Sequence, residues 1–244
     1  MKYGTLAVAF AALMAATQVS AAGTWGGWYA GINAGYGSLD ADTSRDVTVP
    51  GAYVAQDVAD IELAGAIDLD GDGFVGGFQV GHNWESGTLV LGLEGDFSFT
   101  SLDDSASVTQ AWTVPYPGTL TTDAAIEQKW LATLRARLGT TLGATLVYAT
   151  AGAALSDVEF SQGFSETTFP VAFGSISNSE TLTGWTAGVG AELPISEATT
   201  LKIEYLHVDL GSIDTAGSVG VGSTVTGKAD VTNDIVRLGL NFKF

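Results

Sequence analysis

Three aspartates alternate with other residues in the segment from Asp68 through Asp70 and Asp72 to Gly73. Alternating carboxylates followed by glycine form the first half of a calcium-binding loop, because oxygen ligands wrap the hard cation and glycine permits the sharp turn. The twelfth loop position is Gln79 rather than glutamate, and the residues that follow are typical of a strand, not of a helix. The segment therefore predicts either a calcium site or an acidic stretch that leads into a strand.

The chain has two histidines, His82 and His207, and no cysteine. Both histidines occupy apolar positions of alternating runs, which favours an interfacial role over catalysis or metal binding. Nucleophilic catalysis needs a base that a third group holds in place, and no spacing here indicates such a triad. Without cysteine there is no disulfide scaffold, zinc finger or thiol nucleophile. We therefore expect a protein that is not an enzyme and has no cofactor other than a possible calcium ion.

Charged residues also recur at the polar positions of alternating runs. Four acids and six bases share these positions: Glu94, Asp96, Glu192 and Glu204 with Lys129, Arg135, Arg137, Lys202, Arg237 and Lys243. Their sum is 6 − 4 = +2 in a chain whose formal net charge is −18. A narrow interior must pair its charges, because unpaired buried charge is costly. The ten residues predict a charge network in a lumen, either structural or lining a selective pore.

The elements that must position these residues are strands, because apolar residues recur with a period of two. Short links at about 86–87, 139–143 and 194–199 alternate with long links at about 38–73, 100–125, 157–181 and 211–230. This pattern predicts an all-β fold, an eight-stranded antiparallel up-and-down transmembrane barrel with short periplasmic turns, long extracellular loops and strands of about ten residues. The runs span 28–37, 77–84, 89–99, 129–138, 146–155, 185–193, 201–207 and 236–244, and the parity of the fifth is ambiguous.

Two observations favour an apolar exterior over an apolar interior. The interior of an eight-stranded barrel is only just wide enough for side chains, and the apolar parity carries most of the aromatic residues within these runs. These aromatic residues lie towards the strand ends, as in the girdles of membrane barrels. We therefore expect the apolar parity to face lipid and the glycine-rich parity to face the lumen.

The first residues and the composition indicate export. Residues 1–22 have Lys2, an apolar core of about 11 residues and small residues at the end, which is the pattern of a signal peptide. Residues 23–244 then form the barrel domain, with no apolar run long enough for a membrane helix. The acidic balance excludes a nucleic-acid partner. Nine acids against Arg45 in residues 39–72 predict strongly anionic outer loops.

Several short motifs carry a resemblance to a known family. They are Trp28–Gly31 with Gly35–Gly37, Gly76–Gly81, Leu134–Gly139, and Glu204–Leu206 with Asp209–Gly211. In this order they are similar to the small eight-stranded outer-membrane barrels called porin-family, outer-membrane immunogenic or opacity-like proteins, and to the transmembrane domain of outer-membrane protein A. The resemblance covers the whole mature chain. His82 stands where the family pattern favours tyrosine, and no peptidoglycan-binding domain follows the last strand.

The resemblance implies a location in the cell outer membrane, with outer-membrane lipid and lipopolysaccharide as partners. The last run resembles the signal that the barrel-assembly machinery reads, through Leu238, Leu240, Phe242 and Phe244. We expect a barrel that contributes to envelope integrity and presents acidic surface loops, whose carboxylates share divalent cations with lipopolysaccharide phosphates. The alternatives are a narrow diffusion pore, and a surface receptor or adhesin for haem or host ligands.

Overall fold

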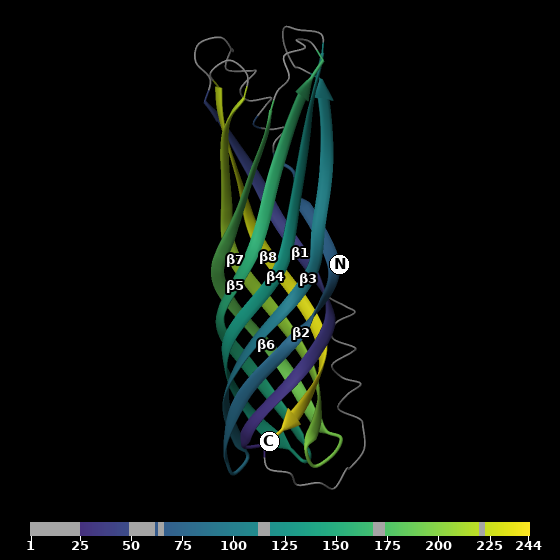
Figure 1. Ribbon diagram of the computed structural model, residues 1–244, viewed down its shortest axis with the longest axis vertical. Helices are drawn as coiled ribbons and strands as arrows, with labels where there is room; N and C mark the ends of the chain where they lie inside the picture. Colours follow the sequence, from purple (N-terminus) through teal and green to yellow (C-terminus); the bar gives the residue numbers. More distant parts are fainter. Residues whose placement is uncertain (1–24, 49–61, 63–65, 112–117, 168–173, 220–222) are drawn as a thin grey trace.

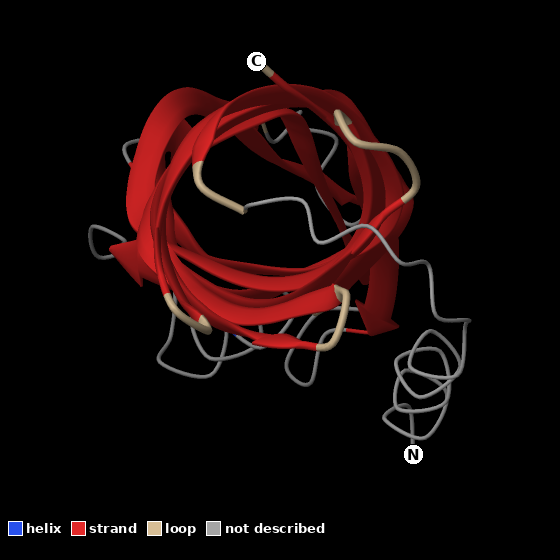
Figure 2. Ribbon diagram, turned by 90° about the horizontal axis from the view of Figure 1, so that it is seen from below, coloured by secondary structure: helices blue, strands red, loops and turns tan. Residues whose placement is uncertain are grey.

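The computed structural model describes residues 25–48, 62, 66–111, 118–167, 174–219 and 223–244 of the chain. Eight antiparallel strands pair with their sequence neighbours, and β1 pairs with β8 to close a barrel (Figures 1 and 2). Among the described residues, no helix is long and apolar enough to cross a membrane. The predicted signal peptide lies outside these residues. The strands are β1 (Gly27–Thr48), β2 (Leu69–Ser86), β3 (Leu89–Ala111), β4 (Thr119–Leu142), β5 (Thr145–Glu166), β6 (Ser175–Pro194), β7 (Thr199–Val219) and β8 (Ser223–Lys243).

One end of the barrel carries the three short turns, which join β2 to β3, β4 to β5 and β6 to β7 (Figure 1). Near this short-turn end the side chains alternate as expected, with apolar residues outside and polar residues or glycine inside. On β1, for example, Trp28 and Ile32 are more than half exposed, whereas Asn33 is buried. The structure decides which face of β5 points inward, since Leu146 and Tyr148 are buried and Ala149 and Ala151 are exposed.

The strands are about twice as long as predicted, with 18 to 24 residues each, and they continue into the segments expected to be loops. In this extension the polarity is inverted. On β1, Leu39 and Ala41 point inward and are buried, whereas Asp40 and Asp42 point outward and are exposed. The barrel is therefore apolar outside near the short-turn end and apolar inside near the long-loop end. The expected acidic loops are, in large part, the outer face of long strands.

In the extension the barrel separates into two four-stranded sheets. The β2–β3 ladder stops at Val75 opposite Thr100, and the β6–β7 ladder stops at Trp185 opposite Asp209. Among the described residues, side chains rather than ladder bonds join the sheets beyond these points; Asn178 Nδ2 donates to the carbonyl of Asp214 at 2.8 Å. An apolar core fills the space between the sheets, with Leu39, Leu69, Val208 and Ile213 from one and Leu102, Ile126, Val158 and Phe160 from the other.

Two irregularities reverse the alternation of side chains along a strand. A bulge at Lys129 shifts the register of β4, so even-numbered residues point inward before it and odd-numbered residues after it. A second bulge lies between Asp209 and Gly211 in β7. Gly211 has a φ of 71°, which glycine adopts without steric cost. Each bulge changes whether even-numbered or odd-numbered residues point inward. Apolar residues therefore still face the interior in the extension.

We expect Phe160→Ala to lower the free energy of unfolding by about 3–5 kcal/mol, because a fully buried aromatic ring leaves a cavity. Val108→Ala, at an exposed position of the same extension, should change it by less than about 0.5 kcal/mol. Denaturant unfolding in detergent micelles measures both. Equal and small losses would mean that water, not a packed core, fills the extension.

Candidate functional site

The structure brings eight of the ten predicted lumen residues together inside the barrel. We call them the lumen charge network: Glu94 and Asp96 on β3, Arg135 and Arg137 on β4, Glu192 on β6, Lys202 and Glu204 on β7, and Arg237 on β8. Each is at most 7% exposed. The alternation of these strands directs all eight side chains inward, so residues from five strands meet near the barrel axis.

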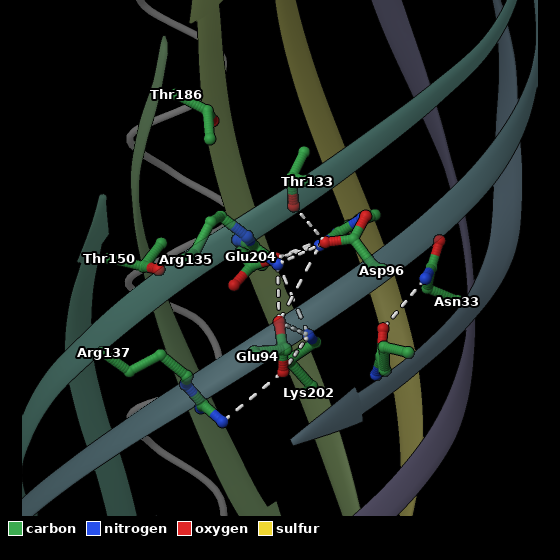
Figure 3. Close-up of polar contacts among 12 residues, drawn as sticks. Asn33, Glu94, Asp96, Thr133, Arg135, Arg137, Thr150, Thr186, Lys202 and Glu204 are labelled. Atoms are coloured by element: carbon green, nitrogen blue, oxygen red, sulfur yellow. Dashed lines mark hydrogen bonds and ion pairs between the residues drawn. The ribbon is translucent and has the colours of Figure 1, made fainter. Parts of the chain in front are cut away.

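Arg135 and Arg237 make the most carboxylate contacts in the network, and Figure 3 shows Arg135 beside Glu94, Asp96 and Glu204. Arg135 contacts three carboxylates: its Nη2 is 2.5 Å from Glu94 Oε1 and 2.9 Å from Asp96 Oδ2, and its Nη1 is 3.1 Å from Glu204 Oε2. Arg237 bridges two of them, with Nη1 2.9 Å from Asp96 Oδ1 and Nη2 2.7 Å from Glu204 Oε2. Removal of either guanidinium would take one ion-pair partner from at least two buried carboxylates.

The remaining cations complete the network on the side of the short turns. Lys202 Nζ lies 3.0 Å from Glu94 Oε1, and Arg137 forms an ion pair with Glu192. Thr200 donates a further hydrogen bond to Glu192 Oε2 at 3.1 Å. Four acids and four bases thus face one another, so the formal charge of the network is 4 − 4 = 0. Neutrality is what a nearly dry lumen requires, because an uncompensated buried charge costs several kcal/mol.

Two tyrosines that the sequence analysis did not select belong to the same site. Tyr29 donates to Glu94 Oε2 and Tyr148 donates to Glu204 Oε1, each at 2.8 Å. The Arg137 guanidinium lies 3.9 Å from the Tyr148 ring centroid, in a cation–π contact. Lumen glycines make room for both rings, since a Cβ on Gly81 or Gly190 would lie 2.3 Å from the Tyr29 or Tyr148 hydroxyl. In the sequence, the one signal that could have identified these tyrosines was their position on the inward-facing side of β1 and β5.

Apolar layers border the network on both sides along the barrel axis. At the short-turn end, Trp25, Val90, Leu146 and Tyr148 form a small buried cluster. At the other side lies the apolar core of the extension. A buried amide row runs beside the network, since Asn33 donates to Gln79 at 2.9 Å and Gln79 donates to Asn241 at 2.6 Å. The two apolar layers limit the access of water to the network. The lower local dielectric constant strengthens each ion pair.

Two of the ten predicted network residues lie elsewhere. Lys129 was assigned to the lumen by its parity with Leu131, but the bulge at this position turns its side chain outward, so that prediction is wrong. There its Nζ lies 2.8 Å from Glu159 Oε2, and the hydrogen bond to Glu159 raises the pKa of Lys129. Lys243 is half-buried at the short-turn end, with Nζ 4.5 Å from the Trp25 ring centroid. It borders the lumen at this end of the barrel rather than lying in its buried centre.

The calcium-loop prediction is also wrong in its geometry. Asp70 and Asp72 lie within β2, and Asp68 immediately precedes it. Alternate residues of a strand project to the same face at intervals of about 6.6 Å, so these carboxylates cannot wrap one cation. All three are exposed on the outer face. Among the residues that the structure describes, no group of three or more Asp, Glu, His or Cys side chains is arranged to hold a metal ion.

Aromatic side chains mark both borders of the outer apolar belt. At the short-turn end, His82 lies between the exposed rings of Trp28 and Trp84, with centroids 4.9 and 4.6 Å away. At the other border, aromatic residues hydrogen-bond to acids on the neighbouring strand; Trp185 Nε1 donates to Asp209 at 3.2 Å and Tyr205 donates to Asp234 at 2.5 Å. His207 Nδ1 also lies 2.9 Å from Asp234. Rings with an apolar body and a polar tip are typical of membrane–water interfaces.

A closed barrel with an apolar outer belt, aromatic borders and a buried neutral charge network defines a transmembrane β-barrel of the outer-membrane class. The chain belongs to the family described as outer membrane protein beta-barrel domain, which matches residues 6–244. Its short turns are therefore periplasmic, its long loops are extracellular, and it resides in the outer membrane.

Named relatives are likewise outer-membrane proteins. The chain is 35% identical to the 31 kDa outer-membrane immunogenic protein of Brucella melitensis biotype 1 over 224 residues, 91% of this chain and 84% of the relative. It is 29% identical to the 22 kDa outer membrane protein of Rhizobium leguminosarum bv. viciae, over 70% of this chain and 67% of the relative. Among solved structures, OprG of Pseudomonas aeruginosa aligns with 15% identity and a TM-score of 0.44, covering 90% of this chain and 98% of that chain.

We expect Arg135→Met to lower the free energy of unfolding by about 3–5 kcal/mol, because three buried carboxylates lose a shared partner. Lys129→Met removes an exposed ion pair on the same strand and should leave the free energy of unfolding nearly unchanged, because both of its charges stay solvated. Denaturant titration of the refolded barrel in detergent compares the two. Similar losses would contradict a dry, coupled network.

Proposed function

We propose that the protein is a non-enzymatic, non-conducting scaffold of the outer membrane that presents an anionic surface above the lipid. The observation that carries this proposal is the filled lumen, in which eight charged side chains at most 7% exposed neutralise one another between two apolar layers. A lumen of this kind supports rigidity of the barrel. It does not favour a narrow diffusion pore, because ions would have to cross both apolar layers and displace fixed ion pairs.

Single-channel recording tests the filled lumen. In planar lipid bilayers, the refolded wild-type protein should give no reproducible conductance steps. The Arg135→Met variant, provided that it folds, is the matched comparison, because it loosens the network without removing a strand. Stable open conductance steps from the wild-type protein would contradict the scaffold proposal and support a diffusion pore.

The outer face of the extension supports the second part of the proposal, the interaction with lipopolysaccharide. Among the described residues of this face, the exposed cations are Lys129 and Lys228, and the exposed acids are Asp40, Asp42, Asp46, Asp68, Asp70, Asp72, Asp103, Asp123, Glu127, Glu180, Asp214 and Asp230. We call this surface the anionic collar. It begins where the aromatic border of the apolar belt ends, which is the level of the lipid phosphates.

Part of the collar places like charges directly opposite one another. Asp103 of β3 is in register with Glu127 of β4, which is in register with Glu159 of β5. Lys129 compensates Glu159, whereas Asp103 and Glu127 have no ion pair among the described residues. Facing like charges destabilise a sheet, and cations from outside would offset this cost. We infer that divalent cations are shared between these carboxylates and lipopolysaccharide phosphates, since the described side chains alone form no metal site.

Chelator sensitivity of cells tests this interaction. A strain that lacks the protein should become permeable to a hydrophobic dye at a lower EDTA concentration than the wild type. Restoring the wild-type gene should reverse the effect, whereas the double variant Asp103→Asn/Glu127→Gln should restore it only in part. Ser105→Ala/Ser161→Ala, in the adjacent row of the same strands, serves as the control. Equal sensitivity of all strains would exclude the proposed bridging.

Two further expectations concern partners. The outward residues Leu238 and Phe242 of β8, and Phe244 directly after it, are at least half exposed, and Leu240 points the same way. This exposure supports recognition of the C-terminal strand by the barrel-assembly machinery. Relatives named immunogenic proteins support exposure of the collar and loops at the cell surface, as a receptor or adhesin would also require. The scaffold proposal is preferred, because the described residues supply a reason for the acidic strands without a haem or host ligand.

A further inference from the structure

The chain segment immediately before β1 turns into the periplasmic mouth of the barrel (Figure 2). Its first described residue, Trp25, is only 5% exposed although it lies outside any strand. The next tryptophan, Trp28 on β1, is 54% exposed on the apolar belt. Two neighbouring tryptophans therefore have opposite environments, and Trp25 is directed away from lipid.

Three polar contacts hold Trp25 in this position. Its backbone N–H donates to Glu85 Oε2 at 2.7 Å, and the N–H of Gly26 donates to the same oxygen at 3.3 Å. The Asn83 side chain donates to the Trp25 carbonyl at 3.2 Å. The Lys243 ammonium lies 4.5 Å from the indole centroid. Side chains from β2 and β8, the two strands that pair with β1, thus fix this short segment at the mouth of the barrel.

The indole of Trp25 is linked to the charge network through Tyr148. Trp25 packs with Val90, Leu146 and Tyr148, which are all at most 5% exposed. Tyr148 in turn donates to Glu204 and contacts the Arg137 guanidinium. Water that entered at this point would reach the ion pairs directly and weaken them, because Coulomb interactions fall as the local dielectric constant rises.

We propose that the segment Trp25–Gly26 is a tethered plug that closes the periplasmic mouth and keeps water from the charge network. The apolar core of the extension closes the other side, so the network has two separate seals. This inference rests on the closed lumen proposed above. It adds that the periplasmic seal is a short piece of chain outside the strands, anchored by Glu85, rather than part of the barrel wall.

The absence of cysteine allows a direct test, because an introduced thiol is the single thiol of the chain and its labelling is read on the purified protein after the reaction. Val90→Cys places a thiol behind the plug, and Val208→Cys places one in the apolar core beyond the network. Each is made in the wild-type, Trp25→Gly, Trp25→Phe and Glu85→Gln backgrounds. The rate of labelling by a charged maleimide is measured in isolated outer membranes, where the reagent reaches both faces.

The plug predicts slow labelling of Val90→Cys in the wild-type background and at least tenfold faster labelling with Trp25→Gly. Trp25→Phe should retain most of the protection, and Glu85→Gln should lie between them. The Val208→Cys rate should stay low and unchanged in every background. An unchanged Val90→Cys rate, or an equal acceleration at both thiols, would overturn the plug.

The same experiment separates the plug from the closed lumen on which it rests. Rapid labelling of Val208→Cys in the wild-type background would contradict a packed extension. The plug itself would still be supported in that case if Trp25→Gly accelerated labelling of Val90→Cys alone. Rapid labelling of Val90→Cys in the wild-type background would contradict the plug.

Discussion

Charge neutrality inside a narrow barrel is the constraint on which the structure depends. Eight strands leave an interior that side chains fill, so a charged side chain there loses most of its water. Arg135 and Arg237 meet this constraint by contacting several carboxylates each, and Tyr29 and Tyr148 supply further donors. Such ion pairs add little net stability over apolar packing, but breaking one is costly. The network therefore fixes which residues face inward, and with them the register of five strands.

The inverted polarity of the two halves follows from what surrounds each half. Within the bilayer the solvent is hydrocarbon, so apolar residues face outward and the lumen is polar. Above it the solvent is water, so the same strands bury Leu39 and Phe160 and expose Asp40 and Asp42. The upper part is in effect a small two-sheet sandwich built on a membrane barrel. Its seams fall where the β2–β3 and β6–β7 ladders end.

Much of this arrangement could be predicted from the sequence. Period-two alternation identified seven strands, and the remaining strand, β5, was located as a run that is apolar on both faces. The parity of Glu94, Arg135 and Glu204 placed them in the lumen, because a side chain's face depends only on its position along a regular strand. Lys129 was misplaced because a bulge changes that parity, and the sequence carries no clear signal of the bulge. The strands were predicted too short because the polarity inversion above the membrane resembles an acidic loop. The pairing of acids with bases depends on register, which no single strand reveals.

The inside–outside assignment of β5 is the most direct test, because this strand is apolar on both faces and its sequence did not decide the matter. Spin labels placed singly at Leu146, Ala149, Thr150, Ala151, Ala153 and Ala154 of the cysteine-free chain would report collisions with oxygen dissolved in lipid. The structure predicts that Ala149, Ala151 and Ala153 are accessible to oxygen and that Leu146, Thr150 and Ala154 are shielded. The opposite phase of accessibility would turn the barrel inside out and contradict the buried charge network.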